Sequence, residues 1–219
     1  LPRARERARL QQLLCGTTKS PVLVVGPSGC GKSMLIAKAV ADLLEAEGYH
    51  THGNLDRVHN VLSLRGRQVI AGMSYVGQWE ARAMELLARA KKHRLALWVD
   101  DVHAWGSIGR TTTSDRVLAD FFRGPLARRE LLMIGECTPE QLSLLEHEAP
   151  AFAAAFTRLH LEPTSTAQTL TMMVHESRRL EEELEVAFDP HCYSAIMELS
   201  SALSTGTSLP GRALTPLEA

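Results

Sequence analysis

The chain has 219 residues, 45% of them hydrophobic, which is enough to bury the core of one large domain or of a large and a small one. Its 24 Lys and Arg residues nearly balance its 25 Asp and Glu residues, and the net charge of −1 gives no overall attraction for nucleic acids or anionic membranes. The hydrophobic runs are too short to cross a bilayer and no signal peptide opens the chain, so we expect a cytoplasmic protein without a membrane partner.

Short hydrophobic runs alternate with longer helical patterns along the first three quarters of the chain. This alternation predicts an α/β domain, a parallel sheet with helices on both faces. Expected strands lie at 22–25, 58–64, 95–99, 131–134 and 158–161. A basic amphipathic segment at 3–14 precedes helices expected at 32–47, 78–92, 115–126 and 139–147.

The pattern changes after residue 163, beyond which only helices are expected. They cover 166–184 and 190–202, and a third begins at Pro210, because proline suits a first helical turn. We therefore predict two domains, an α/β domain over 1–163 and a small helical domain over 164–219. Because the chain starts with Leu1 and stops just after a helical segment, we expect it to be a module of a longer protein.

A phosphate-binding motif follows the first expected strand. Residues 26–33 fit G-x-x-x-x-G-K-[ST] between a strand and a helix, which is the context that this motif requires. Its glycines let backbone N–H groups turn toward phosphate oxygens, Lys32 neutralises the β- and γ-phosphates, and the Ser33 hydroxyl binds Mg²⁺. We therefore predict ATP and Mg²⁺ as cofactors. The candidate binding residues are Gly26, Pro27, Ser28, Gly29, Cys30, Gly31, Lys32, Ser33 and Met34.

An acidic pair, Asp100 and Asp101, ends the hydrophobic run 95–99. In a phosphate-loop enzyme an Asp at the carboxyl end of a neighbouring strand holds Mg²⁺ through water, and a following acid can orient and deprotonate the attacking water. We assign the metal role to Asp100 and the base role to Asp101. Aspartates at strand ends also cap loops, so the pair alone is compatible with a structural role.

These motifs resemble those of the AAA+ ATPases, and in particular the first nucleotide-binding module of Clp-type protein unfoldases and disaggregases. The family segment A-G-x-K-Y-R-G-x-F-E-x-R is similar to residues 71–82, and F-I-D-E-I-H is similar to residues 98–103. The segment I-G-A-T-T corresponds to 134–138, and L-P-D-K-A corresponds to 209–213. The resemblance implies a P-loop NTPase fold, a three-layer sandwich around a parallel sheet followed by a helical lid.

The resemblance also assigns roles outside the phosphate loop. Thr138 falls at the polar sensor and Arg212 at a second sensor that contacts the nucleotide. Tyr75 corresponds to the aromatic residue that grips an unfolded polypeptide in a ring channel, although it could also be an ordinary half-buried loop tyrosine. Its neighbours Ser74 and Val76 replace basic residues of the family, which predicts a weaker or differently tuned grip. The partners implied are an unfolded or partner polypeptide and a ring, expected to be hexameric, of this chain alone or mixed with related subunits.

The chain departs from the family where hydrolysis is carried out. The catalytic Glu is replaced by Asp101, whose carboxylate is one methylene shorter, and Ala154 and Ala155 stand in place of the arginine pair that reaches a neighbouring γ-phosphate. Arg158 lies nearby, but the expected strand register places it in the sheet. An arginine finger contributes about 10³–10⁵ to the rate, so we predict an ATPase that is weak in isolation.

Two alternatives follow from this pattern. The first is a regulatory or structural ring subunit that binds ATP with little hydrolysis, and the ATPase rate separates it from a remodelling motor. The second is a nucleic-acid-handling AAA+ protein, which the near-neutral charge and the tyrosine segment disfavour. The four cysteines and nine histidines show no spacing typical of a zinc or disulfide site.

Overall fold

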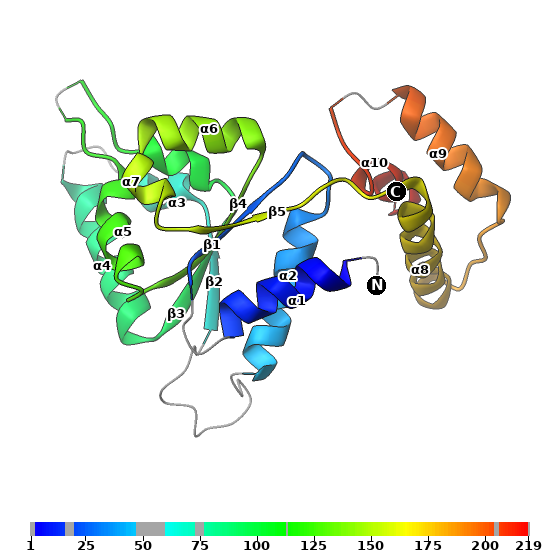
Figure 1. Ribbon diagram of the computed structural model, residues 1–219, viewed down its shortest axis with the longest axis horizontal. Coiled ribbons are helices and arrows are strands. Elements are labelled where there is room, and N and C mark those ends of the chain that lie inside the picture. The colour runs from blue at the N-terminus through cyan, green and yellow to red at the C-terminus, as the bar shows by residue number, and fades with distance from the viewer. Residues whose placement is uncertain are drawn as a thin grey trace.

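The computed structural model of the chain describes residues 3–15, 20–46, 60–72, 77–112, 114–203 and 206–218. Within these residues a five-stranded sheet has the order β2-β3-β4-β1-β5, and each neighbouring pair is parallel. The strands are β1 (Val22–Val25), β2 (Asn60–Leu64), β3 (Leu95–Val99), β4 (Leu132–Cys137) and β5 (Thr157–His160). The predicted α/β fold class with a parallel sheet is confirmed (Figure 1).

Helices cover both faces of the sheet. On one face, α1 (Ala4–Cys15) and α2 (Lys32–Ala46) pack Leu10, Leu14 and Ile36 against Val22 and Val24 of β1. The other face is covered by α3 (Gly66–Ile70), α4 (Gln78–Lys92), the 3₁₀ helix η1 (Val102–Gly106), α5 (Leu118–Ala127), α6 (Pro139–Glu148) and α7 (Pro150–Ala153). The central strands are therefore buried on both sides, as their continuous hydrophobic runs require.

The C-terminal helices form a hydrophobic cluster of their own. They are α8 (Thr166–Leu184), α9 (His191–Leu203) and α10 (Gly211–Glu218), and Figure 1 shows them gathered to one side of the sheet. Buried Met173 and Leu180 of α8 pack with Ala213 and Leu217 of α10. The separate cluster supports our division of the chain after residue 163, which stays a prediction. Among the described residues, no helix is long and hydrophobic enough to cross a membrane.

The strand β4 is longer than its hydrophobic run suggested. We expected a strand at 131–134, whereas β4 continues to Cys137, because Gly135, Glu136 and Cys137 pair with Leu23, Val24 and Val25 of β1. A glycine followed by a glutamate interrupts the hydrophobic run, so the pattern alone ended the strand too early. This extension carries Glu136 to the carboxyl edge of the sheet, where the phosphate loop begins.

Candidate nucleotide-binding site

The predicted phosphate loop connects the end of β1 to the first turn of α2, as the motif requires. Gly29 and Gly31 have positive φ angles of 79° and 93°, a conformation that glycine adopts without strain. A Cβ atom on Gly26 would lie 2.3 Å from the carbonyl oxygen of Leu161, so the loop also needs a residue without a side chain at this point. The loop therefore has the backbone geometry and the helix N-terminus that favour binding of an anion.

Lys32 lies folded over this loop. Its ammonium group donates hydrogen bonds to the carbonyl oxygens of Gly26, at 2.8 Å, and of Pro27, at 3.0 Å. Both acceptors belong to the loop itself, and Lys32 is half-buried. The cation is thus already held at the mouth of the loop, where phosphate oxygens can replace the two carbonyl acceptors.

Ser33 donates its hydroxyl to a residue that the sequence did not reveal. Its Oγ lies 2.8 Å and 3.0 Å from the two carboxylate oxygens of Glu136 in β4. Burial raises the pKa of Glu136, while the Ser33 hydroxyl and the nearby Lys32 cation act in the opposite direction. The signal that could have pointed to this residue was an acid directly after a hydrophobic strand segment in an alternating α/β chain.

The acidic pair lies at the carboxyl end of β3, as expected, but it has other partners. Asp100 accepts a hydrogen bond at 2.9 Å from Nε of Arg65, and both side chains are exposed. Asp101 accepts from the backbone N–H of Gly66, at 2.8 Å and 3.0 Å, and from the indole of Trp105 at 3.3 Å. Asp101 thus satisfies a free N–H at the start of α3. The metal and base roles of the pair stay predictions.

Thr138, the predicted sensor, caps the next helix. Its hydroxyl accepts a hydrogen bond from the backbone N–H of Gln141 at 3.3 Å, and the Gln141 side chain accepts from the Thr138 N–H at 2.8 Å. This reciprocal arrangement is a capping box, which fixes the start of α6. Thr138 lies at the carboxyl edge of the sheet, one residue beyond β4, and its sensor role stays a prediction.

The turn before α10 lies directly on the phosphate loop. The backbone N–H and the hydroxyl of Ser208 both donate to the carbonyl oxygen of Ser28, at 2.8 Å and 2.7 Å, and the N–H of Gly211 donates to that of Gly29 at 2.8 Å. The helical region is therefore hydrogen-bonded to the predicted nucleotide-binding loop. A change in the backbone of the loop would act on α10 through these bonds.

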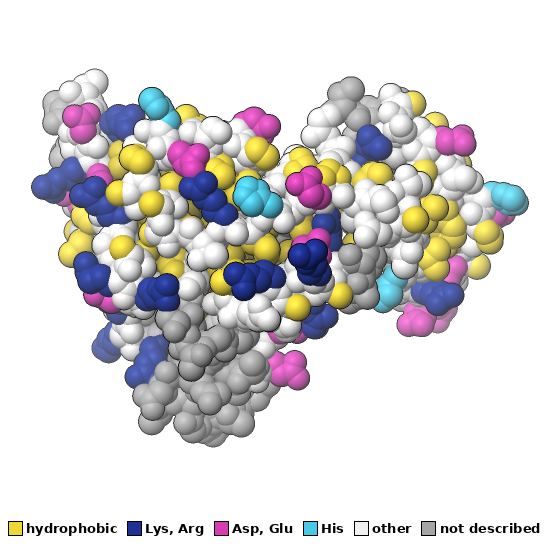
Figure 2. All heavy atoms as spheres, in the orientation of Figure 1, with side chains coloured by type: hydrophobic (Ala, Val, Ile, Leu, Met, Phe, Trp, Pro, Cys, Tyr) yellow, Lys and Arg dark blue, Asp and Glu magenta, His cyan; other side chains and the backbone are white. Residues whose placement is uncertain are grey.

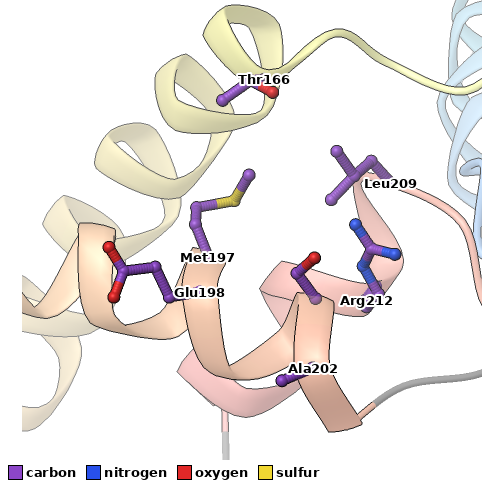
Figure 3. Close-up of a pocket in the computed structure, with 7 residues that line it drawn as sticks. Thr166, Met197, Glu198, Ala202, Leu209 and Arg212 are labelled. Atoms are coloured by element: carbon purple, nitrogen blue, oxygen red, sulfur yellow. The ribbon is translucent and has the colours of Figure 1, made fainter.

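Arg212, the predicted second sensor, follows this contact in α10. Its guanidinium lines a cavity of about 470 Å³ between α8, α9 and α10, and its buried Nε has no hydrogen-bond partner among the described residues. Figure 3 shows Arg212 and Leu209 on one side of this cavity and Met197 and Glu198 of α9 on another. The structure brings the backbone next to Arg212 to the phosphate loop, and a contact between Arg212 and nucleotide stays a prediction.

We expect Gly29→Ala to weaken the contact between the phosphate loop and the turn before α10. A Cβ atom on Gly29 would lie 2.4 Å from Cγ2 of Thr207 and 2.8 Å from the carbonyl oxygen of Ser208, in a backbone with φ of 79°. Gly72→Ala is the matched control, because Gly72 has φ of 75° but no described residue lies within 4 Å of the added atom. Gly29→Ala should lower the free energy of unfolding by about 1–3 kcal/mol more than the control and speed hydrogen exchange at the Ser208 amide. Equal effects of both variants in denaturant titration would show that the contact is too weak to matter.

The remaining predicted residues fall into two groups. Tyr75 and its neighbours at 73–76 lie outside the described residues. At the end of α7, Ala154 is exposed and Ala155 is half-buried. Arg158 lies in β5 opposite Leu23 and forms an ion pair with Glu146, which confirms that it belongs to the sheet. The replacement of arginine fingers by Ala154 and Ala155 stays a prediction.

The parallel sheet, with a glycine-rich loop between β1 and the N-terminus of α2, defines the class of P-loop nucleotide-binding proteins. The family model described as "ATPase family associated with various cellular activities (AAA)" matches residues 22–138, which is just over half of the chain. The chain belongs to this family, and the matched region runs from β1 to Thr138. The AAA+ resemblance drawn from the sequence motifs is therefore confirmed.

Two curated relatives illustrate the similarity within this family. The chaperone protein ClpB of Tropheryma whipplei (strain TW08/27) is 25% identical over 99% of this chain and 30% of the relative. A probable ATP-dependent Clp protease ATP-binding subunit of Chlamydia pneumoniae is 24% identical over 99% of this chain and 25% of the relative. The chain thus spans about a third or less of the length of these relatives.

Solved structures show the same fold. An Hsp104 complex with ADP from S. cerevisiae has a TM-score of 0.77 at 20% identity. The match covers 99% of this chain and 30% of the Hsp104 chain. A closed-state reconstruction of Hsp104 with ATPγS and FITC casein has a TM-score of 0.76 at 21% identity. The match covers 97% of this chain and 36% of the Hsp104 chain. At these identities the likeness establishes the fold alone.

Proposed function

We propose that this module binds Mg·ATP at residues 26–34 and that ATP binding and hydrolysis there drive unfolding or remodelling of a polypeptide. The observation that carries the proposal is the phosphate loop itself, with its left-handed glycines and with Lys32 and Ser33 at the start of α2, in a chain of the AAA family. Binding of a fluorescent ATP analogue by the wild type and by Lys32→Ala tests it.

The oxygen atoms around Ser33 suit Mg²⁺. Magnesium prefers oxygen ligands, and the Ser33 hydroxyl and the Glu136 carboxylate supply them at the start of α2. When bound, the ion would neutralise part of the charge of the phosphates. In this proposal Ser33 and Asp100 hold the metal, and backbone N–H groups of residues 26–31 hold the phosphates. The oxygen-rich edge of the sheet is therefore compatible with the predicted cofactor.

Hydrolysis in this proposal depends on Asp101 as the base that positions water. Its carboxylate already accepts hydrogen bonds from Gly66 and Trp105, which restrict its orientation. The shorter Asp must also reach about an ångström further than a Glu, and misplacement on this scale can cost about a hundredfold in rate. We therefore expect slow turnover, with Thr138 and Arg212 as the proposed sensors of the γ-phosphate and the nucleotide.

Ring assembly and a polypeptide substrate are part of the same proposal. ClpB is named a chaperone, and one of the Hsp104 structures contains casein, which supports a polypeptide as partner. We infer that the module works in the cytoplasm, in a ring of six copies or in a mixed ring with related subunits. On the face that Figure 2 shows, basic and acidic side chains both occur across the described surface, so that this face gives no support for nucleic acid as the partner.

Tyr75→Ala tests the proposed grip on the polypeptide. If Tyr75 lies in the channel of a ring, its loss should leave ATP binding intact and abolish substrate crosslinking and the stimulation of ATPase activity by substrate. The measurements are crosslinking and phosphate release with an unfolded polypeptide. A loss of thermal stability comparable to that of a core Phe→Ala variant, about 3–5 kcal/mol, would instead indicate an ordinary packed tyrosine.

The alternative of a regulatory ring subunit predicts a different outcome. Such a subunit would bind Mg·ATP with unchanged affinity but release no phosphate, with or without polypeptide. The substitutions at residues 101, 154 and 155 motivate this alternative, whereas the chaperone relatives favour the motor. The ATPase rate of the full-length protein separates the two.

A further inference from the structure

We propose that Glu136 is a positioning residue of the Mg·ATP site, which accepts a hydrogen bond from the Ser33 hydroxyl so that the lone pairs of the serine oxygen stay available to Mg²⁺. This inference rests on the proposed function and adds a residue that neither the sequence motifs nor the acidic pair of β3 supply. The carboxylate would also accept hydrogen bonds from water molecules that Mg²⁺ retains.

The burial of Glu136 is the first observation behind this inference. Glu136 is 6% exposed, and among the described residues it is the one buried residue of the Asp, Glu, Lys, Arg and His types. A buried carboxylate costs several kcal/mol unless it is paired or hydrogen-bonded. Its hydrogen-bonded partner is the neutral hydroxyl of Ser33, and the nearby Lys32 cation, which is itself bonded to the loop carbonyls, also offsets part of this cost. A cation at Ser33 would compensate the charge far better.

The direction of the side chain is the second observation. Glu136 alternates with Leu132 and Ile134, which pack into the cluster on the α1–α2 side of the sheet, so all three face α2. Both carboxylate oxygens lie within 3.0 Å of Ser33 Oγ. A serine hydroxyl that donates its hydrogen bond to a carboxylate keeps both lone pairs for a metal, which is the arrangement that a Mg²⁺ ligand needs.

The positions of the two aspartates are the third observation. The β3–β4 register pairs Val99 with Gly135, so one residue further it places Asp100 beside Glu136. Asp100, however, is bonded to Arg65, and Asp101 to Gly66 and Trp105 on the opposite face. Of these three acids, Glu136 is the one in direct contact with the predicted metal ligand.

Glu136→Gln is the test variant, because it removes the charge while keeping the size of the side chain. The affinity of the protein for a fluorescent ATP analogue is measured against Mg²⁺ concentration and again in EDTA. We expect the Mg²⁺ concentration at half-maximal tightening to rise by about 10- to 100-fold, as for loss of other groups that orient metal ligands. In EDTA the variant should bind ATP as well as the wild type or more tightly, since a negative charge near the phosphates is gone.

Three further variants test whether the effect is specific to the Glu136 charge and acts through Ser33. Glu146→Gln, a Glu on α6 paired with Arg158, is the matched control and should keep the wild-type Mg²⁺ dependence. Glu136→Asp keeps the charge but is shorter, so it should shift the Mg²⁺ midpoint by an intermediate amount. It replaces Glu136→Gln as the test variant if thermal unfolding shows that the Gln variant is not folded. Adding Glu136→Gln to Ser33→Ala should cause little further shift, because the two residues act on the same ligand.

The outcomes are distinct. An unchanged Mg²⁺ midpoint in Glu136→Gln, or an equal loss of affinity with and without Mg²⁺, overturns the inference. A wild type that fails to bind ATP, or that does not respond to Mg²⁺, would instead contradict the proposed function itself.

Discussion

Lys32→Ala should weaken the binding of Mg·ATP by about 10- to 150-fold. Hydrogen bonds to charged groups contribute about 1.5–3 kcal/mol, and Lys32 is the cation that the loop directs toward the β- and γ-phosphates. Its ammonium is held by the Gly26 and Pro27 carbonyls at the site where the phosphates would bind. Titration with a fluorescent ATP analogue measures the loss.

Lys38→Ala is the matched control for this prediction. Lys38 lies in the same helix, is half-exposed and pairs with Asp42 rather than with the loop. Removing it should leave the affinity for ATP unchanged. If Lys32→Ala also binds ATP as the wild type does, the loop is not a phosphate site, and the proposed binding of ATP at residues 26–34 is wrong.

Arginines placed at 154 and 155, where we predict that the family's arginine fingers are replaced, should raise the rate of hydrolysis by up to about 10³–10⁵, or about 4–7 kcal/mol of transition-state stabilisation. Ala154 is exposed at the end of α7, so it can carry an arginine without disturbing the core. Ala155 packs against the hydrophobic cluster under α5 and α7, and an arginine there should cost some stability. Ala154→Arg is therefore the first variant to make, followed by the pair and by addition of Asp101→Glu.

The assay is steady-state phosphate release at saturating Mg·ATP, with assembly of the ring verified for each variant. The increments need not add, because the arginines and the base act on one transition state. Ala151→Arg, on the exposed side of the same short helix, is the control for added charge and should leave the rate unchanged. A wild type that already turns over several ATP molecules per second would mean that Arg158 or a partner subunit supplies the cation.

Strong periodicity explains which parts of the fold could be predicted. The helices α4 and α8 begin and end at the predicted residues, because their hydrophobic positions repeat over many turns and α8 starts at a capping box of Ser165 and Gln168. The hydrophobic runs of β1 and β3 were equally clear. By contrast, α3, η1 and α7 have only four or five residues, too few for a period to show.

The site was predicted only as far as its motif extends. The phosphate loop is local in sequence, so its place between β1 and α2 could be predicted. The contact of Ser33 with Glu136 spans 103 residues and depends on β4 lying next to β1, which the sequence does not specify. The contact of Ser208 with Ser28 spans 180 residues and depends on how the helical region packs. Asp101 was recognised as a strand-end acid, but its bond to Gly66 requires the unpredicted helix α3.

Phosphate release by the full-length protein at saturating Mg·ATP, with and without an unfolded polypeptide, tests the central claim most directly. We expect slow basal turnover that the polypeptide stimulates, and loss of both rates in Lys32→Ala. A rate that does not respond to polypeptide in an assembled ring, or the absence of any nucleotide binding, would contradict it.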